Sequence, residues 1–80
     1  MKVYVVISES IIQGHTSNGL HGVYATKSKA TSTAISAIKG IAGRYYHDVH
    51  TDDICVDGLE FSYQSGNVEV YVSCIDQEVR

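Results

Sequence analysis

The chain has 80 residues, with nine Asp or Glu against six Lys or Arg and a formal net charge of −3 at pH 7. A domain of this length buries only about 60–65% of the surface that its unfolded form exposes, so we expect a single domain over residues 1–80 with one thin core and no cofactor. The acidic balance argues against a general nucleic-acid binder, which needs a basic surface to neutralise phosphates.

The first 25 residues predict two strands joined by a loop. Residues 2–8 are rich in β-branched side chains and apolar on both faces, which is typical of a central strand. Residues 9–19 lose this periodicity and collect glycine, serine and asparagine. They predict a long loop, and long loops in compact domains are often functional. Residues 20–25 then predict a short second strand.

Residues 27–41 predict a helix. The hydroxyl of Thr26 or Ser28 can cap its first turn, and Gly40 or Gly43 can end it. The apolar residues recur at helical spacing and are mostly small, so this helix should pack closely on a sheet. These residues are Ala30, Ala34, Ile35, Ile38, Ile41 and Ala42.

The last third of the chain predicts a β-meander. Apolar and polar residues alternate over residues 59–64 and 68–74, which is the pattern of strands with one buried face. Turn-forming residues 64–67 separate these two strands. The Asp57-Gly58 pair is a strong hairpin signal and adds a short strand before them.

The predicted fold is therefore α+β, with an antiparallel sheet of four or five strands and one helix on one face. The order is strand, strand, helix, then two or three strands. One helix covers one face only, so the other face should meet solvent or a partner. We assign Val3, Val5, Ile7, Leu59, Phe61, Val68, Val70 and Val72 to the helix side, and Tyr4, Val6, Glu60, Ser62, Glu69, Tyr71 and Ile75 to the open side.

The polar connection over residues 44–53 offers a second, weaker site. His47, His50 and Asp52 could hold a metal ion, because imidazole and carboxylate are common ligands. Their spacing matches no known metal motif, and a solvated or capping loop explains the same residues. The favoured interpretation is that no metal binds.

The two cysteines and the lack of a long apolar run predict a cytoplasmic protein with reduced thiols. No stretch approaches the roughly 18 apolar residues that span a bilayer, and no secretory signal is present. We therefore expect Cys55 and Cys74 to be buried, inert thiols in strands, and a disulfide between them is the minority interpretation.

No catalytic motif is apparent. Serines at positions 8, 10 and 17 lack an identifiable base and orienting group, and the glycines lack the context of a nucleotide-binding loop. An enzyme is therefore disfavoured.

Two segments and the terminal meander carry a family resemblance. The run Val3-Tyr4-Val5-Val6-Ile7, followed by a Gly-Val-Tyr step at residues 22–24 and a helix that opens on Ser28-Lys29-Ala30, resembles the plan of short phage-encoded accessory proteins, including small anti-CRISPR proteins. Such proteins commonly act without catalysis, by occupying a surface of a host defence complex. The resemblance implies a protein partner of that kind in the host cytoplasm.

The predicted function is non-enzymatic protein binding, as a phage-type inhibitor of a host or defence protein. A homodimer through the open face is one form of this hypothesis. One alternative is a small-ligand or metal-binding module built on the His/Asp connector and the loop around His15. Another is a nucleic-acid accessory using Lys27, Lys29, Lys39 and Arg44. The predicted contact residues are Tyr4, Glu69 and Tyr71 from the sheet and Tyr45, Tyr46 and Asp48 from the connector.

Overall fold

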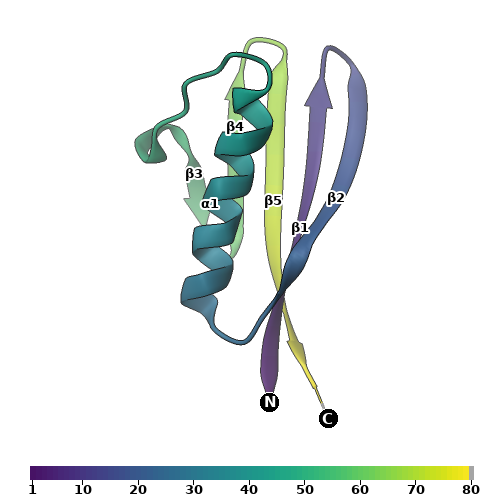
Figure 1. The fold of residues 1–80 in the computed structure, drawn as a ribbon, viewed down its shortest axis with the longest axis vertical. Helices are drawn as coiled ribbons and strands as arrows, with labels where there is room; N and C mark the ends of the chain where they lie inside the picture. Colours follow the sequence, from purple (N-terminus) through teal and green to yellow (C-terminus); the bar gives the residue numbers. More distant parts are fainter. Residues whose placement is uncertain (80) are drawn as a thin grey trace.

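The computed structural model describes residues 1–79, and these form one α-helix and a five-stranded antiparallel sheet (Figure 1). The strand order in the sheet is β2-β1-β5-β4-β3. The predicted α+β fold with one helix is therefore confirmed. In chain order the elements are β1 (Lys2–Ile12), β2 (His15–Tyr24), α1 (Lys27–Gly43), a 3-10 turn (Thr51–Asp53), β3 (Cys55–Asp57), β4 (Glu60–Ser65) and β5 (Val68–Glu78).

The long loop predicted over residues 9–19 is wrong, because those residues form most of a hairpin. β1 continues to Ile12 and β2 begins at His15, so only Gln13 and Gly14 connect them. Both have positive φ, +52° and +83°, as the tightest hairpin turn requires. β2 is an edge strand with largely exposed side chains, so it needs no apolar alternation and looks like a loop in the sequence.

Helix α1 begins and packs as predicted. The Thr26 hydroxyl accepts a hydrogen bond from the backbone N–H of Lys29 at 3.2 Å, so Thr26 rather than Ser28 is the cap. The helix continues through Gly40 and ends at Gly43. Its small side chains let the backbone approach the sheet closely. The buried residues of the helix are Ala30, Ala34, Ile38 and Ala42.

The core lies between α1 and one face of the sheet. β5 alternates as predicted, and its apolar side chains point toward the helix together with Phe61 of β4. Val49 from the connector (residues 44–53) and Ile54, just before β3, complete the core beside them. The buried side chains of β5 are Val68, Val70, Val72 and Cys74.

The predicted orientation of β1 is wrong by one residue. Val6 is fully buried on the helix side, whereas Ile7 is 38% exposed on the other side. Tyr4 lies on the same side of β1 as Val6 and packs against the core, so it does not lie on the open face. A one-residue slip moves every side chain of a strand to the opposite face, and a strand that is apolar on both faces carries no periodic signal to prevent that error.

The two cysteines lie on opposite faces of the sheet. Cys74 is buried under α1, as predicted, and its thiol lies 3.7 Å from the carbonyl oxygen of Ala30. Cys55 is exposed on the short edge strand β3, so the prediction that it is buried is wrong. Both thiols are free.

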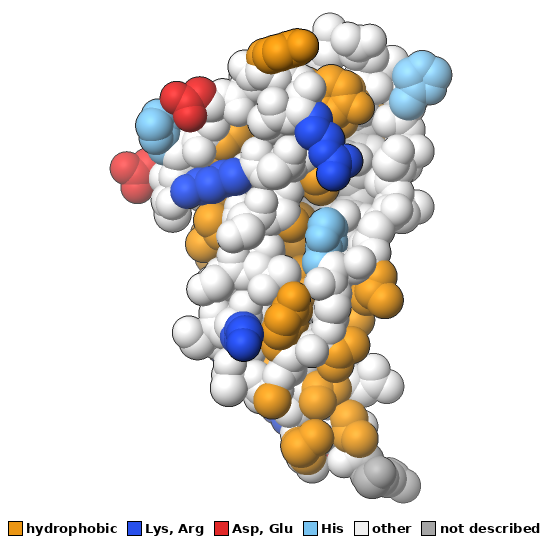
Figure 2. Space-filling view, in the orientation of Figure 1, with side chains coloured by type: hydrophobic (Ala, Val, Ile, Leu, Met, Phe, Trp, Pro, Cys, Tyr) orange, Lys and Arg blue, Asp and Glu red, His pale blue; other side chains and the backbone are white. Residues whose placement is uncertain are grey.

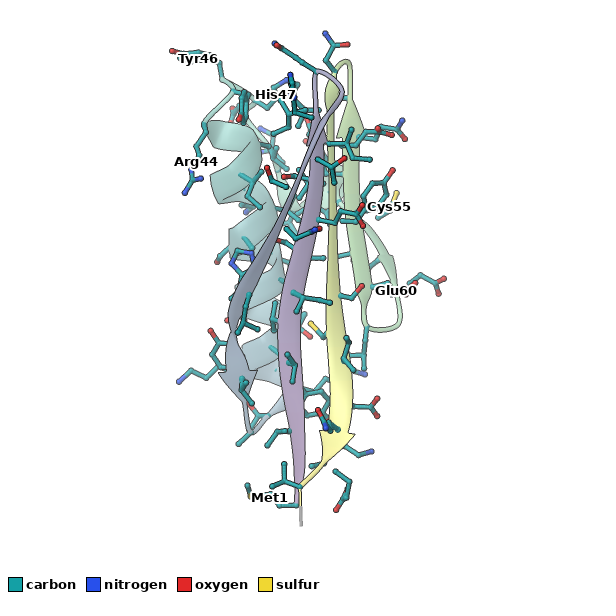
Figure 3. The ribbon with its side chains drawn as sticks, turned by 90° about the vertical axis from the view of Figure 1, so that its right-hand side faces the viewer. Met1, Arg44, Tyr46, His47, Cys55 and Glu60 are labelled. Atoms are coloured by element: carbon teal, nitrogen blue, oxygen red, sulfur yellow. The ribbon has the colours of Figure 1, made fainter. Side chains whose placement is uncertain are left out.

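The second face of the sheet is uncovered within residues 1–79. Figure 3 shows α1 and the connector, with Arg44, Tyr46 and His47, on one side of the sheet and Cys55 and Glu60 on the other. We refer to this second side as the open face. Among the described residues, no helix has both the length and the apolar character needed to cross a membrane.

Candidate functional site

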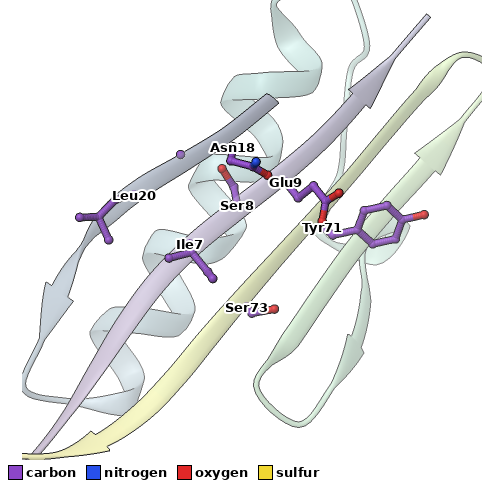
Figure 4. Close-up of a pocket in the computed structure, with 8 residues that line it drawn as sticks. Ile7, Ser8, Glu9, Asn18, Leu20, Tyr71 and Ser73 are labelled. Carbon is purple, nitrogen blue, oxygen red and sulfur yellow. The ribbon is translucent and has the colours of Figure 1, made fainter. Parts of the chain in front are cut away.

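The open face is organised in rows of directly paired side chains. Tyr71 on β5 lies opposite Glu9 on β1 and Ser62 on β4. In the next row, Ile7 lies between Leu20 on β2 and Ser73 on β5 (Figure 4). Paired residues of antiparallel strands project from the same face and interact across the strands. Side chains from four strands therefore form one surface.

The centre of the open face is apolar and exposed. Tyr71 is 40% exposed, Ile7 38% and Leu20 69%. Together they line a shallow depression of about 440 Å³. A further row extends the apolar surface, because Val23 and Ile75 both pair with Val5 and both are exposed. Contiguous exposed apolar surface of this kind typically marks an interaction site.

All charged side chains on the open face among residues 1–79 are acidic. Lys2 lies on the same side of β1 as Tyr4 and Val6, and the other described cations belong to α1 or follow it. Figure 2 shows blue Lys and Arg side chains along the helix. The Lys and Arg side chains of residues 1–79 therefore all lie on the helix side, which also carries carboxylates such as those of Asp76 and Glu78, whereas the open face carries carboxylates only. The acidic residues that pair across the open face are Glu9, Asp57, Glu60 and Glu69.

Hydrogen bonds connect the Tyr71 side chain with Glu69 on β5 and, through Glu69, with Gln64 on β4. The Tyr71 hydroxyl donates to Glu69 Oε1 at 3.2 Å, and the Gln64 side-chain amide donates to the same oxygen at 2.9 Å. The bond to Glu69, with smaller contributions from desolvation and from the charges of Glu69 and Glu9, raises the pKa of Tyr71. The hydroxyl therefore stays protonated, with its ring free for contact.

The six predicted contact residues do not form one surface. Glu69 and Tyr71 lie together on the open face, as expected. Tyr4 lies on the helix side instead. Tyr45, Tyr46 and Asp48 are exposed, but they follow the end of α1 on that same side (Figure 3).

Besides Ile7, which was assigned to the wrong side of β1, sequence reasoning missed Leu20 and Val23 of the open face. A bulge in β2 is the cause: Val6 pairs with Gly22 and Ile7 with Leu20, so His21 is an extra residue. The bulge brings Leu20 and Val23 to the same face although they are three residues apart, which breaks the period-2 pattern. Gly22, with φ +137°, is the one sequence signal of this irregularity.

The connector does not assemble a metal site. His47 Nδ1 lies 3.1 Å from the Tyr63 hydroxyl, which fastens the connector to β4. His50 Nε2 lies 3.6 Å from the Asp48 carboxylate, and both side chains are exposed. Nowhere in residues 1–79 are three His, Cys, Asp or Glu side chains grouped so that they could hold a metal ion, so His47, His50 and Asp52 are not brought together as ligands.

The open face has the chemistry of a recognition surface. It presents an aromatic ring and branched aliphatic side chains with hydroxyls and carboxylates around them, which is the composition of many protein interfaces. Small ligands are usually enclosed in concave pockets, whereas this depression is shallow and broad. Compared with known proteins, the chain matches no protein-family model, no curated protein and no solved structure.

Proposed function

We propose that this chain is a non-enzymatic protein-binding module whose contact surface is the open face of the sheet. The observation that carries the proposal is the exposed apolar centre formed by Ile7, Leu20 and Tyr71 on a face that no described element covers. Burying such side chains contributes about 25 cal/mol per Å² of apolar surface removed from water. Tyr71 is the central anchor, because a tyrosine combines a large rigid ring with a polar tip.

The charge of the open face supports a particular kind of partner. Carboxylates on β1, β5, β4 and β3 border the apolar residues, and no Lys or Arg of residues 1–79 accompanies them. The complementary surface has an apolar centre with a rim of Lys and Arg. A second copy of this chain fits less well, because two open faces would bring carboxylates toward carboxylates.

The biological role that we propose is inhibition of a host or defence protein by a phage-type accessory factor. The resemblance to short phage-encoded proteins supports this role. The charge argument is consistent with it, because proteins that handle nucleic acid carry the basic surfaces that an acidic face complements. Inhibition would then follow from occupying such a surface.

A site-specific crosslinking experiment tests the proposed surface. A photoreactive phenylalanine analogue replaces Tyr71 in one sample and Ser36, which is exposed on α1, in another. Both proteins are irradiated in a bacterial lysate. We expect a discrete protein adduct from position 71 and none from position 36. Equal labelling from the two positions would count against the open face.

The affinity for the purified adduct partner then identifies the contact residues. Truncating a buried interfacial tyrosine should cost about 2 kcal/mol or more, so Tyr71→Ala should weaken binding about thirtyfold or more. Tyr46→Ala is the matched control, because Tyr46 is 99% exposed on the other side of the sheet. Unchanged binding by Tyr71→Ala with loss in Tyr46→Ala would move the site to the connector.

Analytical ultracentrifugation tests self-association through the same face. We expect a monomer at micromolar concentration. A dimer that Leu20→Asp dissociates would instead identify a second copy of the chain as the partner, because Leu20 on the edge strand β2 is 69% exposed on the open face.

A further inference from the structure

A second hollow lies on the helix side of the sheet, between the end of α1 and the β1–β2 hairpin. It encloses about 460 Å³. In Figure 2, blue and pale-blue side chains border the seam between the helix and this hairpin. The polar residues that matter here are Ser10, His15, Ser17, His21, Arg44 and Tyr45. We refer to this hollow as the serine groove.

The polar side chains that line the serine groove can donate hydrogen bonds, and none of the lining residues is acidic. None of its twelve lining residues is Asp or Glu, although the chain contains nine of them. Arg44 supplies a fixed positive charge. Ser10 and Ser17 are cross-strand partners, so their side chains project side by side into this side of the sheet. An anion would meet donors here and no repelling carboxylate.

One wall of the serine groove is held in place by its own hydrogen bonds. His21 Nε2 lies 2.7 Å from the Ser8 hydroxyl, and Ser8 is buried. The Tyr24 hydroxyl donates to the backbone carbonyl of His21 at 3.1 Å. These contacts hold the imidazole of His21, the extra residue of the bulge in β2, on the helix side of the sheet. A positioned donor binds a ligand with less loss of conformational entropy than a mobile one.

The last carbonyls of α1, next to the groove, are paired with backbone N–H groups. The backbone N–H groups of Arg44, Tyr45, Tyr46 and His47 donate to the last carbonyls of the helix at 3.0–3.3 Å. Paired carbonyls contribute less unsatisfied negative charge than free ones. The partial negative charge that remains at the helix end is smaller than the full positive charge of Arg44.

We propose that the serine groove binds the phosphoryl group of a small phosphate monoester. Arg44 lies at the rim of the groove, and its exposed side chain points away from the sheet in Figure 3. Its guanidinium becomes the charged anchor when this flexible side chain turns over the groove, because its planar fork matches two phosphate oxygens. The hydroxyls of Ser10 and Ser17 and the imidazole of His15 supply further donors, and the paired side chains of Ser8 and His21 form the wall beside them. The organic part would contact Ile12, Ile41 and the Tyr45 ring, which line the same groove.

This site lies on the opposite side of the sheet from the open face, so the two proposals can fail separately. The probes are inorganic phosphate and phenyl phosphate, titrated into ¹⁵N-labelled protein and followed by two-dimensional NMR. We expect saturable shifts in the amides around Ser10, Ser17 and Arg44, larger for phenyl phosphate. Phenol and sodium chloride at matched ionic strength should produce none. Shifts that do not saturate, or that sodium chloride reproduces, would overturn the proposal.

Two variants that each remove one positive charge sharpen the test. Arg44→Gln should weaken phenyl phosphate binding at least tenfold. Lys27→Gln removes a charge at the other end of α1, outside the groove, and should change the affinity less than twofold. Both residues are exposed, so both variants should keep the parent melting temperature. Equal weakening in the two variants would contradict a site at Arg44.

A single-stranded oligonucleotide is the last arm of the experiment. If the groove selects a monoester, the oligonucleotide should bind more weakly than phenyl phosphate at 0.15 M salt. Tighter oligonucleotide binding that weakens in Lys27→Gln and Arg44→Gln alike would overturn the proposal in favour of a nucleic-acid interface along α1. Tyr71→Ala should leave phenyl phosphate binding unchanged, because Tyr71 does not line the groove.

Discussion

The Tyr71 hydroxyl donates a hydrogen bond to the carboxylate of Glu69, two residues earlier on the same strand, over 3.2 Å. Glu9 lies directly opposite Tyr71 on the neighbouring strand. The tyrosine at the centre of the open face is therefore surrounded by an acceptor and by negative charge. Both favour the neutral phenol over the phenolate.

We predict that Glu69→Gln lowers the pKa of Tyr71 toward the ordinary tyrosine value of about 10. The hydrogen bond to Glu69 is the largest cause of the raised pKa, and the substitution also removes one of the two contributing charges. NMR of ¹³C-labelled tyrosine rings, followed through alkaline pH, resolves Tyr71 from the other five tyrosines. Glu60→Gln is the control, because Glu60 lies on the same face and does not contribute to the raised pKa.

The raised pKa of Tyr71 also determines how the free energy of unfolding changes with pH. The unfolded chain releases the Tyr71 proton at a lower pH than the folded chain does. The contribution of Tyr71 to the free energy of unfolding is therefore fully present below about pH 10 and is lost as the pH rises through the folded pKa. Urea denaturation at a series of alkaline pH values should show a smaller loss for Glu69→Gln than for the parent. An identical pH dependence would mean that Glu69 does not act on Tyr71 in solution.

Replacing an isoleucine by alanine should lower the free energy of unfolding by different amounts on the two sides of the sheet. Ile38 is fully buried between α1 and the sheet, so Ile38→Ala should lower the free energy of unfolding by about 2–5 kcal/mol. Ile75 is 48% exposed on the open face, and Ile75→Ala should cost less than about 1 kcal/mol. Urea denaturation followed by circular dichroism measures both. Equal costs would mean that the open face is covered in solution, for example by a second copy.

The parts of the fold that sequence reasoning predicted are those whose burial is one-sided. In β5 and α1, apolar and polar residues alternate with the period of the element, so each buried face could be assigned. β1 is apolar on both faces, and its orientation depends on pairing with β5, where Ser8 lies opposite Val72. β2 is polar because it is an edge strand, and polarity there resembles a loop.

The sequence likewise predicted only those residues of the open face that lie on a strand with one-sided burial. Glu69 and Tyr71 belong to β5, and they were assigned correctly to the open face. Ile7 was assigned to the wrong face because the orientation of β1 was wrong by one residue. Leu20 was not assigned to the open face, because its position there depends on the bulge in β2. The serine groove was not predicted either, since it joins residues of the hairpin to Arg44 and Tyr45, which lie more than twenty residues away in the chain.

The helix cap offers a local test. Thr26→Ala removes the acceptor for the Lys29 N–H, so it should lower the free energy of unfolding by about 1 kcal/mol. Ser28→Ala lies two residues later on an exposed position and should have an effect within about 0.5 kcal/mol. Thermal denaturation of the two single variants compares them. A larger cost for Ser28→Ala would identify Ser28 as the cap.

Replacing Gly40 and Gly66 by alanine should change the free energy of unfolding in opposite directions. Gly40 lies within α1, and a β-carbon added there would have no atom within 4 Å, so Gly40→Ala should raise the free energy of unfolding by about 0.5–1 kcal/mol. Gly66 has φ +57° in the turn between β4 and β5, where an alanine costs about 1–2 kcal/mol. Urea denaturation measures both signs. Destabilisation by Gly40→Ala would contradict an exposed helical glycine.

The Gln13-Gly14 turn tests the hairpin that replaced the expected loop. Gln13 has φ +52°, a conformation that asparagine tolerates better than glutamine, so Gln13→Asn should raise the free energy of unfolding by roughly 0.5 kcal/mol. The backbone N–H of residue 13 donates to the Asn67 carbonyl at 3.0 Å, and this bond is independent of the side chain. Gln13→Val should instead cost about 1 kcal/mol or more, because a β-branched side chain clashes at positive φ. Thermal denaturation ranks the three proteins, and equal stability of Gln13→Asn and Gln13→Val would show that the connection is a flexible loop in solution.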